Sequence, residues 1–214
     1  MNTDTSQIKF WKGSFGKEYT DRNIYNPVEL DEMYRKWFGV TRTEMNIEFI
    51  GNLDKSIRIL EVGSNVGNQL LVLQKMGFKN LSGIEIQDYA AELSKSRAKN
   101  INIIQVSGFE IPFKDGFFDI VFTSGVLIHI HPADIIKIIG EMHRCSKKYI
   151  WCFEYFSEEH KEIEYRGNKQ VLWKGNFAKI FLDNFSDLKL VKEVRYKYKD
   201  SDNVDSMFLL EKAE

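Results

Sequence analysis

The chain has 214 residues, 43% of them hydrophobic and 29% charged, a balance typical of a globular protein rather than a disordered one. Its 30 lysines and arginines are matched by 31 acidic residues, and the net charge of −1 argues against nucleic acid or an anionic membrane as a partner. Length and charge therefore predict one sizeable core and neither of these partners.

Sequence features that mark cellular location favour the cytoplasm. No apolar run approaches the ~20 residues that span a bilayer, and MNTDTSQ, residues 1–7, carries no signal-peptide pattern. Cys145 and Cys152 lack metal-ligand spacing, so we expect ordinary core thiols and no bound metal. The sequence leaves the oligomeric state open.

The segment FWKGSFGKEYTDRN, residues 10–23, mixes four aromatic residues with glycines and charges. It shows neither strand alternation nor a clean helical stripe. Two interpretations are open: a lid over a ligand, or aromatic anchors that pin the N-terminus to the core.

The rest of the chain alternates helices with short apolar runs. Helical spacing predicts one or two helices over 28–53, and later helices ending near Gly77 and over 88–99 and 134–143. Apolar runs predict strands over 57–62, 81–86, 101–106, 116–125 and 148–156. This rhythm is typical of a parallel sheet with helices on both faces.

The tail departs from this rhythm. Residues 188–198 alternate, with one face predicted to carry Leu190, Val194, Tyr196 and Tyr198. A polar turn leads to SMFLLEK, so we expect a hairpin with one antiparallel strand. The lysines of the opposite face favour a protected edge strand over a nucleic-acid patch.

A glycine loop follows the first predicted strand. LEVGSNVG places Gly63 and Gly67 where a strand turns into a helix. Asn65 and Asn68 stand where the dinucleotide fingerprint requires glycines, and no Gly-Lys-Ser/Thr follows, so neither pyrophosphate motif is present.

Glu85 ends the second predicted strand, where a carboxylate can accept hydrogen bonds from both ribose hydroxyls of a nucleoside. A ribose acceptor beside a loop that is not built for pyrophosphate points to S-adenosylmethionine. The alternative is a tight turn beside a solvated strand end.

Residues 55–212 resemble class I S-adenosylmethionine-dependent methyltransferases. ILEVGSNVG is similar to the first motif of that family, and IPFKDGFFDIVFTSGVLIHI to its later motifs. The resemblance implies a Rossmann-like, mostly parallel seven-stranded sheet that ends in an antiparallel hairpin. It also implies cofactor contacts from Glu61, Gly63, Ser64, Asn65, Gly67, Glu85, Ile86, Ser107, Gly108, Phe109, Ser124 and Gly125. Ser107 replaces a common adenine-binding acid, so backbone groups of 107–109 are expected to take that role.

Three segments resemble a narrower group, the pseudaminic acid biosynthesis-associated methylases: residues 10–23, GVLIHI and YRGNKQVLWKGNF. This resemblance implies O-methylation of an acidic sugar, free or nucleotide-activated, for flagellin or surface-glycan glycosylation. Methylation of another small metabolite, such as an amino-sugar nitrogen, and a non-catalytic cofactor-binding regulator are the alternatives.

Roles for the remaining polar and aromatic residues follow from the chemistry of methyl transfer. We expect Trp11, Phe15 and Tyr19 to wall the cofactor and Arg22 to bind a carboxylate. His129 and His131, beyond the fourth strand, are candidate general bases or structural residues.

The chain divides into an N-terminal lid and helical segment, 1–54, and a cofactor-binding core, 55–214. An insertion around 157–176 offers Tyr165, Arg166, Trp173 and Lys174 as substrate ligands, or else only a polar helix start with a packed tryptophan.

Overall fold

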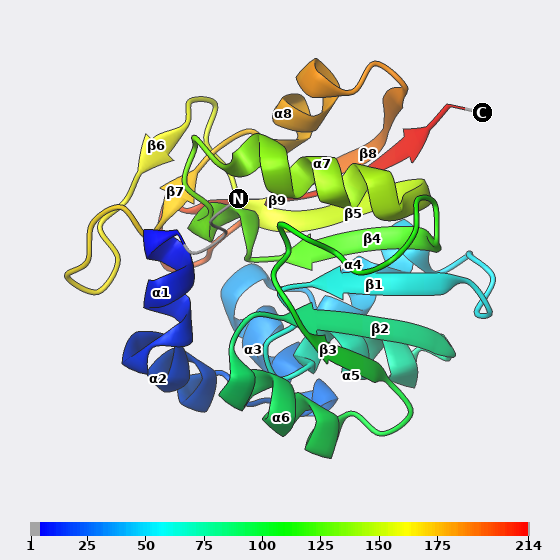
Figure 1. The fold of residues 1–214 in the computed structure, drawn as a ribbon, viewed down its shortest axis with the longest axis horizontal. Helices are drawn as coiled ribbons and strands as arrows, with labels where there is room; N and C mark the ends of the chain where they lie inside the picture. Colours follow the sequence, from blue (N-terminus) through cyan, green and yellow to red (C-terminus); the bar gives the residue numbers. More distant parts are fainter. Residues whose placement is uncertain (1–4, 214) are drawn as a thin grey trace.

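The computed structural model describes residues 5–213, and residues 1–4 and 214 lie outside the described part. The expectation that residues 1–7 form no signal peptide therefore falls partly on residues that are not described. Within the described chain, seven strands form one sheet in the order β3-β2-β1-β4-β5-β9-β8 (Figure 1). The strands are β1 (Arg58–Val62), β2 (Asn80–Glu85), β3 (Asn102–Gln105), β4 (Phe118–Ser124), β5 (Ser146–Tyr155), β8 (Leu188–Lys197) and β9 (Val204–Lys212).

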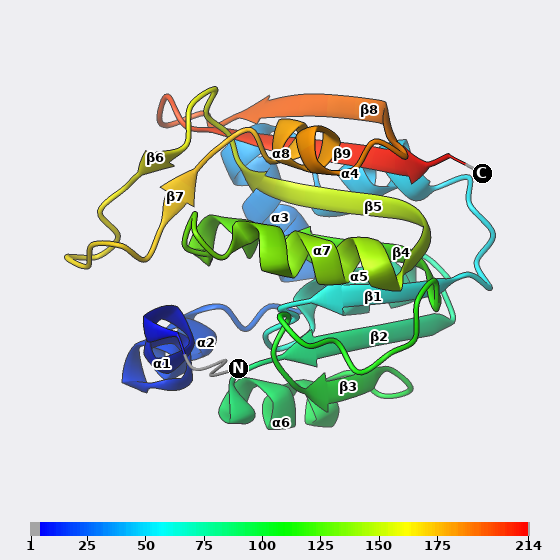
Figure 2. The same ribbon diagram turned by 45° about the horizontal axis from the view of Figure 1, so that its top comes forward.

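The first five of these strands are parallel, whereas β9 runs antiparallel to both β5 and β8. This confirms the predicted α/β fold, a mostly parallel sheet with a C-terminal antiparallel hairpin. Parallel strands place their carboxyl ends at one edge of the sheet, and α1 (Ser6–Lys12), α2 (Ser14–Arg22) and a small hairpin lie beside that edge (Figure 2). The small hairpin pairs β6 (Lys161–Glu162) with β7 (Trp173–Lys174).

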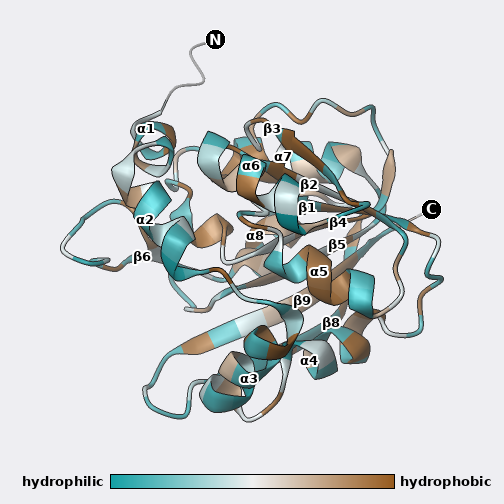
Figure 3. Cartoon of the chain, turned by 90° about the horizontal axis from the view of Figure 1, so that it is seen from below, coloured by the Kyte–Doolittle hydropathy of each residue, from teal (hydrophilic) through white to brown (hydrophobic). Residues whose placement is uncertain are grey.

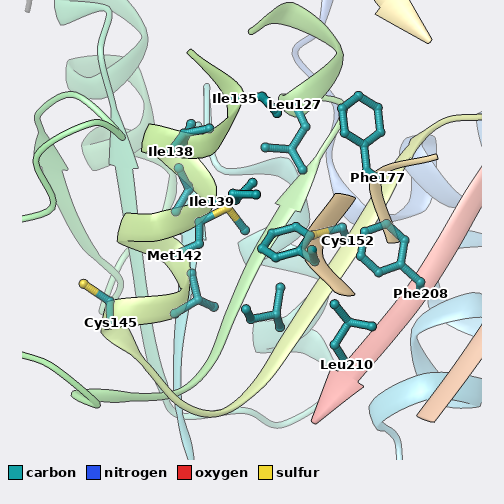
Figure 4. Close-up of a cluster of buried hydrophobic side chains, with 14 of the residues drawn as sticks. Leu127, Ile135, Ile138, Ile139, Met142, Cys145, Cys152, Phe177, Phe208 and Leu210 are labelled. Carbon is teal, nitrogen blue, oxygen red and sulfur yellow. The ribbon is translucent and has the colours of Figure 1, made fainter. Parts of the chain in front are cut away.

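Helices cover both faces of the sheet and create two hydrophobic cores. One core lies under α3 (Pro27–Phe38), α4 (Arg42–Ile50), α5 (Asn68–Lys75) and α6 (Asp88–Arg97). The other lies under α7 (Ile135–Cys145) and α8 (Phe177–Asn184). In Figure 4, side chains of α7 meet those of the strands and α8, among them Ile138, Ile139, Met142, Cys152, Phe177 and Phe208.

These helices are amphipathic, and burial of their apolar faces against the sheet stabilises the folded state. In Figure 3, α3, α5 and α6 each carry both hydrophobic and hydrophilic segments. Each fully buried Leu, Ile or Phe side chain contributes roughly 1.5–3 kcal/mol through removal of apolar surface from water. Cys145 and Cys152 are buried free thiols within the α7-side core, as expected.

Capping explains why residues 28–53 form two helices instead of one. Asn26 and Glu29 form a capping box at the start of α3, and Pro27 occupies its first turn. Gly39 ends α3 in the left-handed region at φ 86°, which favours glycine. Thr41 and Glu44 then form a second capping box that starts α4.

Residues 10–23, which show no clean helical stripe in the sequence, lie largely in two short helices. Trp11, Phe15 and Tyr19 follow the i, i+4, i+8 spacing of one helical face. Gly13 separates α1 from α2, so the stripe is shared between two helices that are each too short to show a clean periodicity.

The tail also differs in detail from its predicted pattern. The β8–β9 register shifts between Leu190 and Lys192, which moves later side chains to the other face. Leu190 is 45% exposed, whereas Val194 and Tyr196 pack on the core beneath α3 and α4. Helix α8 begins directly after the insertion, as the alternative of a polar helix start with a packed tryptophan implied, and Phe177, Ala178 and Phe181 give it an apolar face.

Candidate functional site

The loop after β1 turns tightly enough to place backbone N–H groups at the carboxyl edge of the sheet. Gly63 adopts φ 72°, and the N–H groups of Gly63 and Ser64 both donate to the Ile84 carbonyl at 2.9 Å. A Cβ on Gly63 would lie 2.7 Å from Val126 Cγ2. Glycine is therefore required here by both conformation and space.

Glu85 is fixed beside this loop by two backbone donors. Its Oε2 accepts from the Asn65 N–H and its Oε1 from the Gln87 N–H, each at 2.8 Å. The side chain is 9% exposed, and burial raises the pKa of Glu85 although the two N–H groups act to lower it. Each oxygen keeps acceptor capacity, so the carboxylate is oriented in advance for two further donors.

The N-terminal helices are attached to this same loop by polar contacts. Thr20 Oγ1 lies 3.0 Å from Gln87 Oε1 and 3.1 Å from Asn65 Oδ1. Gln87 Nε2 donates to the Trp11 carbonyl at 2.8 Å. At Gly16 a Cβ would lie 1.8 Å from that carbonyl oxygen and 2.4 Å from Gln87 Nε2, so α1, α2 and Gln87 meet more closely than any other residue at this position would allow.

Two adjoining cavities, of about 160 Å³ and about 660 Å³, open at this edge of the sheet. The smaller lies against the ends of β1, β2 and β3, and the larger extends toward α3, β5, β9 and the insertion. They share a junction lined by Tyr19, Gly63, Asn65, Ser124, Gly125 and His129. A ligand in one cavity can therefore meet a ligand in the other.

His129 stands at the junction with its ring fixed. It is 9% exposed, lies 4.4 Å from the Trp11 ring between centroids, and its Nδ1 lies 2.8 Å from the Val171 carbonyl. A carbonyl oxygen only accepts, so Nδ1 carries the proton and Nε2 is left with a lone pair. Burial lowers the pKa of His129 to about 4, which keeps the ring neutral at physiological pH.

The site residues predicted from the sequence divide according to these cavities. The smaller cavity is lined by Trp11, Glu85, Ile86, Ser107, Gly108 and Phe109. The larger cavity is lined by Arg22, Glu61, Ser64, Tyr165 and Arg166. The fold thus brings together segments separated by more than a hundred residues.

Five predicted site residues lie outside both linings: Phe15, Gly67, His131, Trp173 and Lys174. Gly67 instead faces α6, where a Cβ would lie 2.8 Å from Ser94 Oγ. His131 packs edge-on against the buried Trp173. Lys174 bonds Asn203, and Phe15 contacts Tyr165 from outside the cavity.

Sequence reasoning missed several lining residues. Thr20 and Gln87 tie the helices to the loop, and Tyr34, Glu154 and Asp205 line the larger cavity. Gln87 directly follows the second predicted strand, 81–86. Residues at this position lie at the ligand-binding edge of a parallel sheet, so the sequence could have identified it. Asp205 belongs to a polar turn in the sequence, where nothing distinguishes it from its neighbours.

The residues present fit S-adenosylmethionine. Five buried polar atoms of the cavity walls have no partner within residues 5–213, and three of them, Trp11 Nε1, Glu61 Oε2 and Ser64 Oγ, belong to residues predicted to contact the cofactor. Burial raises the pKa of Glu61 well above its usual value although the Arg42 guanidinium acts to lower it, and an ammonium group would supply the missing donor. Ile86, Val106 and Phe109 give the smaller cavity apolar walls suited to a base. Residues 5–213 contain no cluster of three or more His, Cys, Asp or Glu able to hold a metal ion.

Known proteins resemble both the sequence and the fold. The family profile of the methyltransferase domain matches residues 60–152. An uncharacterized methyltransferase of Staphylococcus carnosus (strain TM300) is 30% identical over 148 residues, 65% of this chain and 68% of that protein. EEF1A lysine methyltransferase 2 of Danio rerio is 26% identical over 129 residues, and the chain spans about half its length, 53%.

Among solved structures, Burkholderia thailandensis 1,6-didemethyltoxoflavin-N1-methyltransferase, with bound 1,6-didemethyltoxoflavin and S-adenosylhomocysteine, superposes with a TM-score of 0.72. At 12% identity, over 100% of this chain and 93% of that one, this similarity shows the fold alone. The fold and the site define a class I methyltransferase. The chain belongs to the S-adenosylmethionine-dependent methyltransferase family, which confirms the predicted cofactor. No helix within residues 5–213 is long and apolar enough to cross a membrane.

Proposed function

We propose that the protein methylates a hydroxyl group of a small acidic sugar, pseudaminic acid or its nucleotide-activated form, for surface-glycan or flagellin glycosylation. The observation that carries this proposal is His129 at the junction of the two cavities, neutral and with Nε2 free to accept a proton. A neutral hydroxyl is a poor nucleophile, and a positioned base contributes about 10²–10⁴-fold to such a reaction.

The groups that would hold the cofactor line both cavities, Glu85 the smaller and Glu61 the larger, so the cofactor would reach past the junction and the acceptor would take the rest of the larger cavity. S-adenosylmethionine provides an electrophilic methyl group, and Glu85, Glu61 and the loop at Gly63 are the groups that would hold it. His129 Nε2 takes the proton that the acceptor hydroxyl loses as its oxygen gains the methyl group. Trp11 and Tyr19 cover the junction and exclude water.

The walls of the larger cavity favour a small acceptor with an acidic group. The N-terminal helices and the insertion meet over the cavity, with Phe15 and Tyr165 rings 5.9 Å apart and Gln7 Nε2 donating to the Gln170 carbonyl. A covered cavity suits a small molecule better than a polymer. Arg22 and Arg166 line it, and a guanidinium matches the geometry of a carboxylate.

The buried carboxylates of Glu154 and Asp205 in this cavity favour a second candidate, N-methylation of an amino sugar. An amine that is already deprotonated needs no base, so the two reactions differ in their need for His129.

Mass spectrometry of acceptor mixtures tests the proposal directly. The protein is incubated with S-adenosylmethionine and pseudaminic acid, free or nucleotide-activated, with and without His129→Asn. We expect one added methyl group, matching S-adenosylhomocysteine, and loss of turnover in His129→Asn while cofactor binding persists. Absence of product from either acceptor despite cofactor binding would refute the proposed substrate. Full activity of His129→Asn would refute the role of the base.

A further inference from the structure

The larger cavity contains a carboxylate with one oxygen that has no partner in the described part of the chain. Asp205 lies at the start of β9 and is 3% exposed, and it lines the cavity. Its Oδ2 accepts from the Tyr198 hydroxyl at 3.0 Å. Its Oδ1 is buried and has no hydrogen-bond partner within residues 5–213.

The neighbouring carboxylate, that of Glu154, differs from Asp205 because both of its oxygens have hydrogen-bond partners. Glu154 precedes Tyr155, the residue that pairs with Asp205 across β5 and β9. Glu154 is equally buried, but its two oxygens accept from the Val126 and Ile128 N–H groups, at 3.1 and 3.4 Å. Glu154 therefore holds the loop that carries His129. Asp205 has no comparable structural task for Oδ1, and an unpaired buried acceptor is unfavourable unless a ligand supplies the donor.

Nearby cations do not supply that donor. The Lys174 ammonium bonds Asn203 and lies 5.4 Å above the Tyr155 ring, while Arg42 bonds Asn46 and Tyr34. Neither forms an ion pair with Asp205 in the described chain. Aromatic side chains complete the cavity wall around this end: Tyr34, Trp37, Phe38, Phe153, Tyr155 and Tyr198. A carboxylate among aromatic rings suits a primary ammonium group, which brings several donors and a positive charge.

We propose that Asp205 binds an amino group of the methyl acceptor, at a position separate from the atom that is methylated. This inference rests on the proposed function, because it takes the larger cavity as the acceptor site. In the sheet β5 lies between β4 and β9, and Asp205 pairs with Tyr155 whereas Ser124 pairs with Phe153. Two strand spacings across the sheet, ~9.5 Å, and two residues along the strand, ~6.6 Å, therefore separate Asp205 from the junction by about 12 Å. Asp205 is accordingly a recognition residue, and the acceptor carries an amino group remote from its reacting hydroxyl.

The protonation of Asp205 gives this subsite a pH dependence. Burial raises the pKa of Asp205 to about 8. The charged and titratable groups that face it are Tyr34, Arg42, Glu154, Tyr155, Lys174 and Tyr198. Only the ionised carboxylate attracts an ammonium group strongly, so binding of an amine that itself stays protonated tightens as pH rises from 7 toward 8.5.

Binding of simple amines tests the subsite without requiring turnover. Affinities for D-glucosamine, N-acetyl-D-glucosamine and D-glucose are measured by ligand-observed NMR titration, in the presence of saturating S-adenosylhomocysteine. We expect glucosamine to bind about tenfold or more tightly than the two uncharged sugars, as a charged hydrogen bond implies. Asp205→Asn should abolish this preference. Asp183→Asn makes the same change on the exposed surface of α8 and should preserve it.

Equal binding of the three sugars by the wild-type protein, or a preference that persists in Asp205→Asn, would overturn the inference. If Asp205→Asn fails to fold, Tyr198→Phe removes the donor to Oδ2 that helps to keep Asp205 ionised and should reduce the preference, and the wild-type comparison still decides. Methyl transfer is assayed separately. An amine preference without methylation of any acidic sugar would refute the proposed substrate and leave the subsite standing. Methylation of an acidic sugar with no preference for amines would refute the subsite and leave the proposed substrate standing.

Discussion

At the scale of single residues, two buried side chains near the glycine loop have protonation and orientation set by their surroundings. Glu85 is held by two backbone N–H groups, and His129 by one carbonyl. Each is thereby left with free acceptor atoms at a cavity wall. These are the properties that ligand recognition and proton transfer require, and each leads to a quantitative expectation.

Replacement of Glu85 by alanine should weaken S-adenosylhomocysteine binding about 10- to 100-fold, because hydrogen bonds to a charged group contribute roughly 1.5–3 kcal/mol. Isothermal titration calorimetry measures the change. Glu92→Ala, on the exposed face of α6, is the matched control and should bind normally. Unchanged affinity in Glu85→Ala would exclude the ribose-binding role.

The acid limb of the turnover profile should report His129. Since its pKa is lowered to about 4, the ring is already in its base form above about pH 5, and kcat should not depend on His129 ionisation between pH 6 and 8. The rate measured at saturating acceptor should fall only as pH drops toward 4. A titration of kcat near the ordinary histidine value of about 6.5 would contradict a buried neutral base.

At the scale of elements, α1 and α2 behave as a cover whose contacts with the core are few and specific. Their attachment rests on Thr20 and Gln87, on the hydrogen bond from the Tyr89 hydroxyl to Asp21, and on ring contacts such as that of Trp11 with His129. A segment held by such contacts can detach without unfolding of the sheet, because neither hydrophobic core within residues 5–213 includes a residue of α1 or α2.

Gly16→Ala should therefore detach these helices selectively. The added Cβ would lie 1.8 Å from backbone, which flexible side chains cannot relieve. We expect faster proteolysis within residues 5–23. We also expect cofactor affinity to fall about tenfold or more, because the loss of one or two contacts changes binding by about that factor. The melting temperature of the core should stay close to that of the wild type. Gly13→Ala, where the nearest atom lies 3.2 Å away, is the milder comparison. Equal resistance of Gly16→Ala and Gly13→Ala to proteolysis would show that the close contact at Gly16 is not needed to hold these helices in place.

At the scale of the whole molecule, the buried acids of the larger cavity make stability depend on pH. Burial raises the pKa of Glu154 to about 7 and that of Asp205 to about 8. The folded state thus holds protons that the unfolded state has already released at pH 6.5. Stability must fall as pH rises through these values. His129 has the opposite sign, but its effect is small above pH 6.5, where the unfolded histidine loses the rest of its protons by about pH 7.5.

The free energy of unfolding of the ligand-free protein should accordingly fall by about 2 kcal/mol between pH 6.5 and 8.5. Urea denaturation at a series of pH values measures the slope. Glu154→Gln cannot titrate and should flatten the dependence, whatever its effect on absolute stability. A stability that is constant or rises through this window would mean that the two acids are ionised in the folded state.

The sequence by itself determined the order of strands and helices along the core, the glycine turn at Gly63 and the acid at Glu85. These features depend on local periodicity and on backbone conformation, which neighbouring residues largely decide. The helices of residues 6–22 escaped prediction because Gly13 divides one aromatic stripe between two short elements.

Only the tertiary structure decided which side chains share a cavity. Tyr34, Glu154 and Asp205 come from three distant elements that the sheet order brings together. His131 and Trp173, equally plausible in sequence, face one another away from both cavities. The physical reason is that burial and long-range pairing depend on strand order and register, for which a local pattern carries no signal.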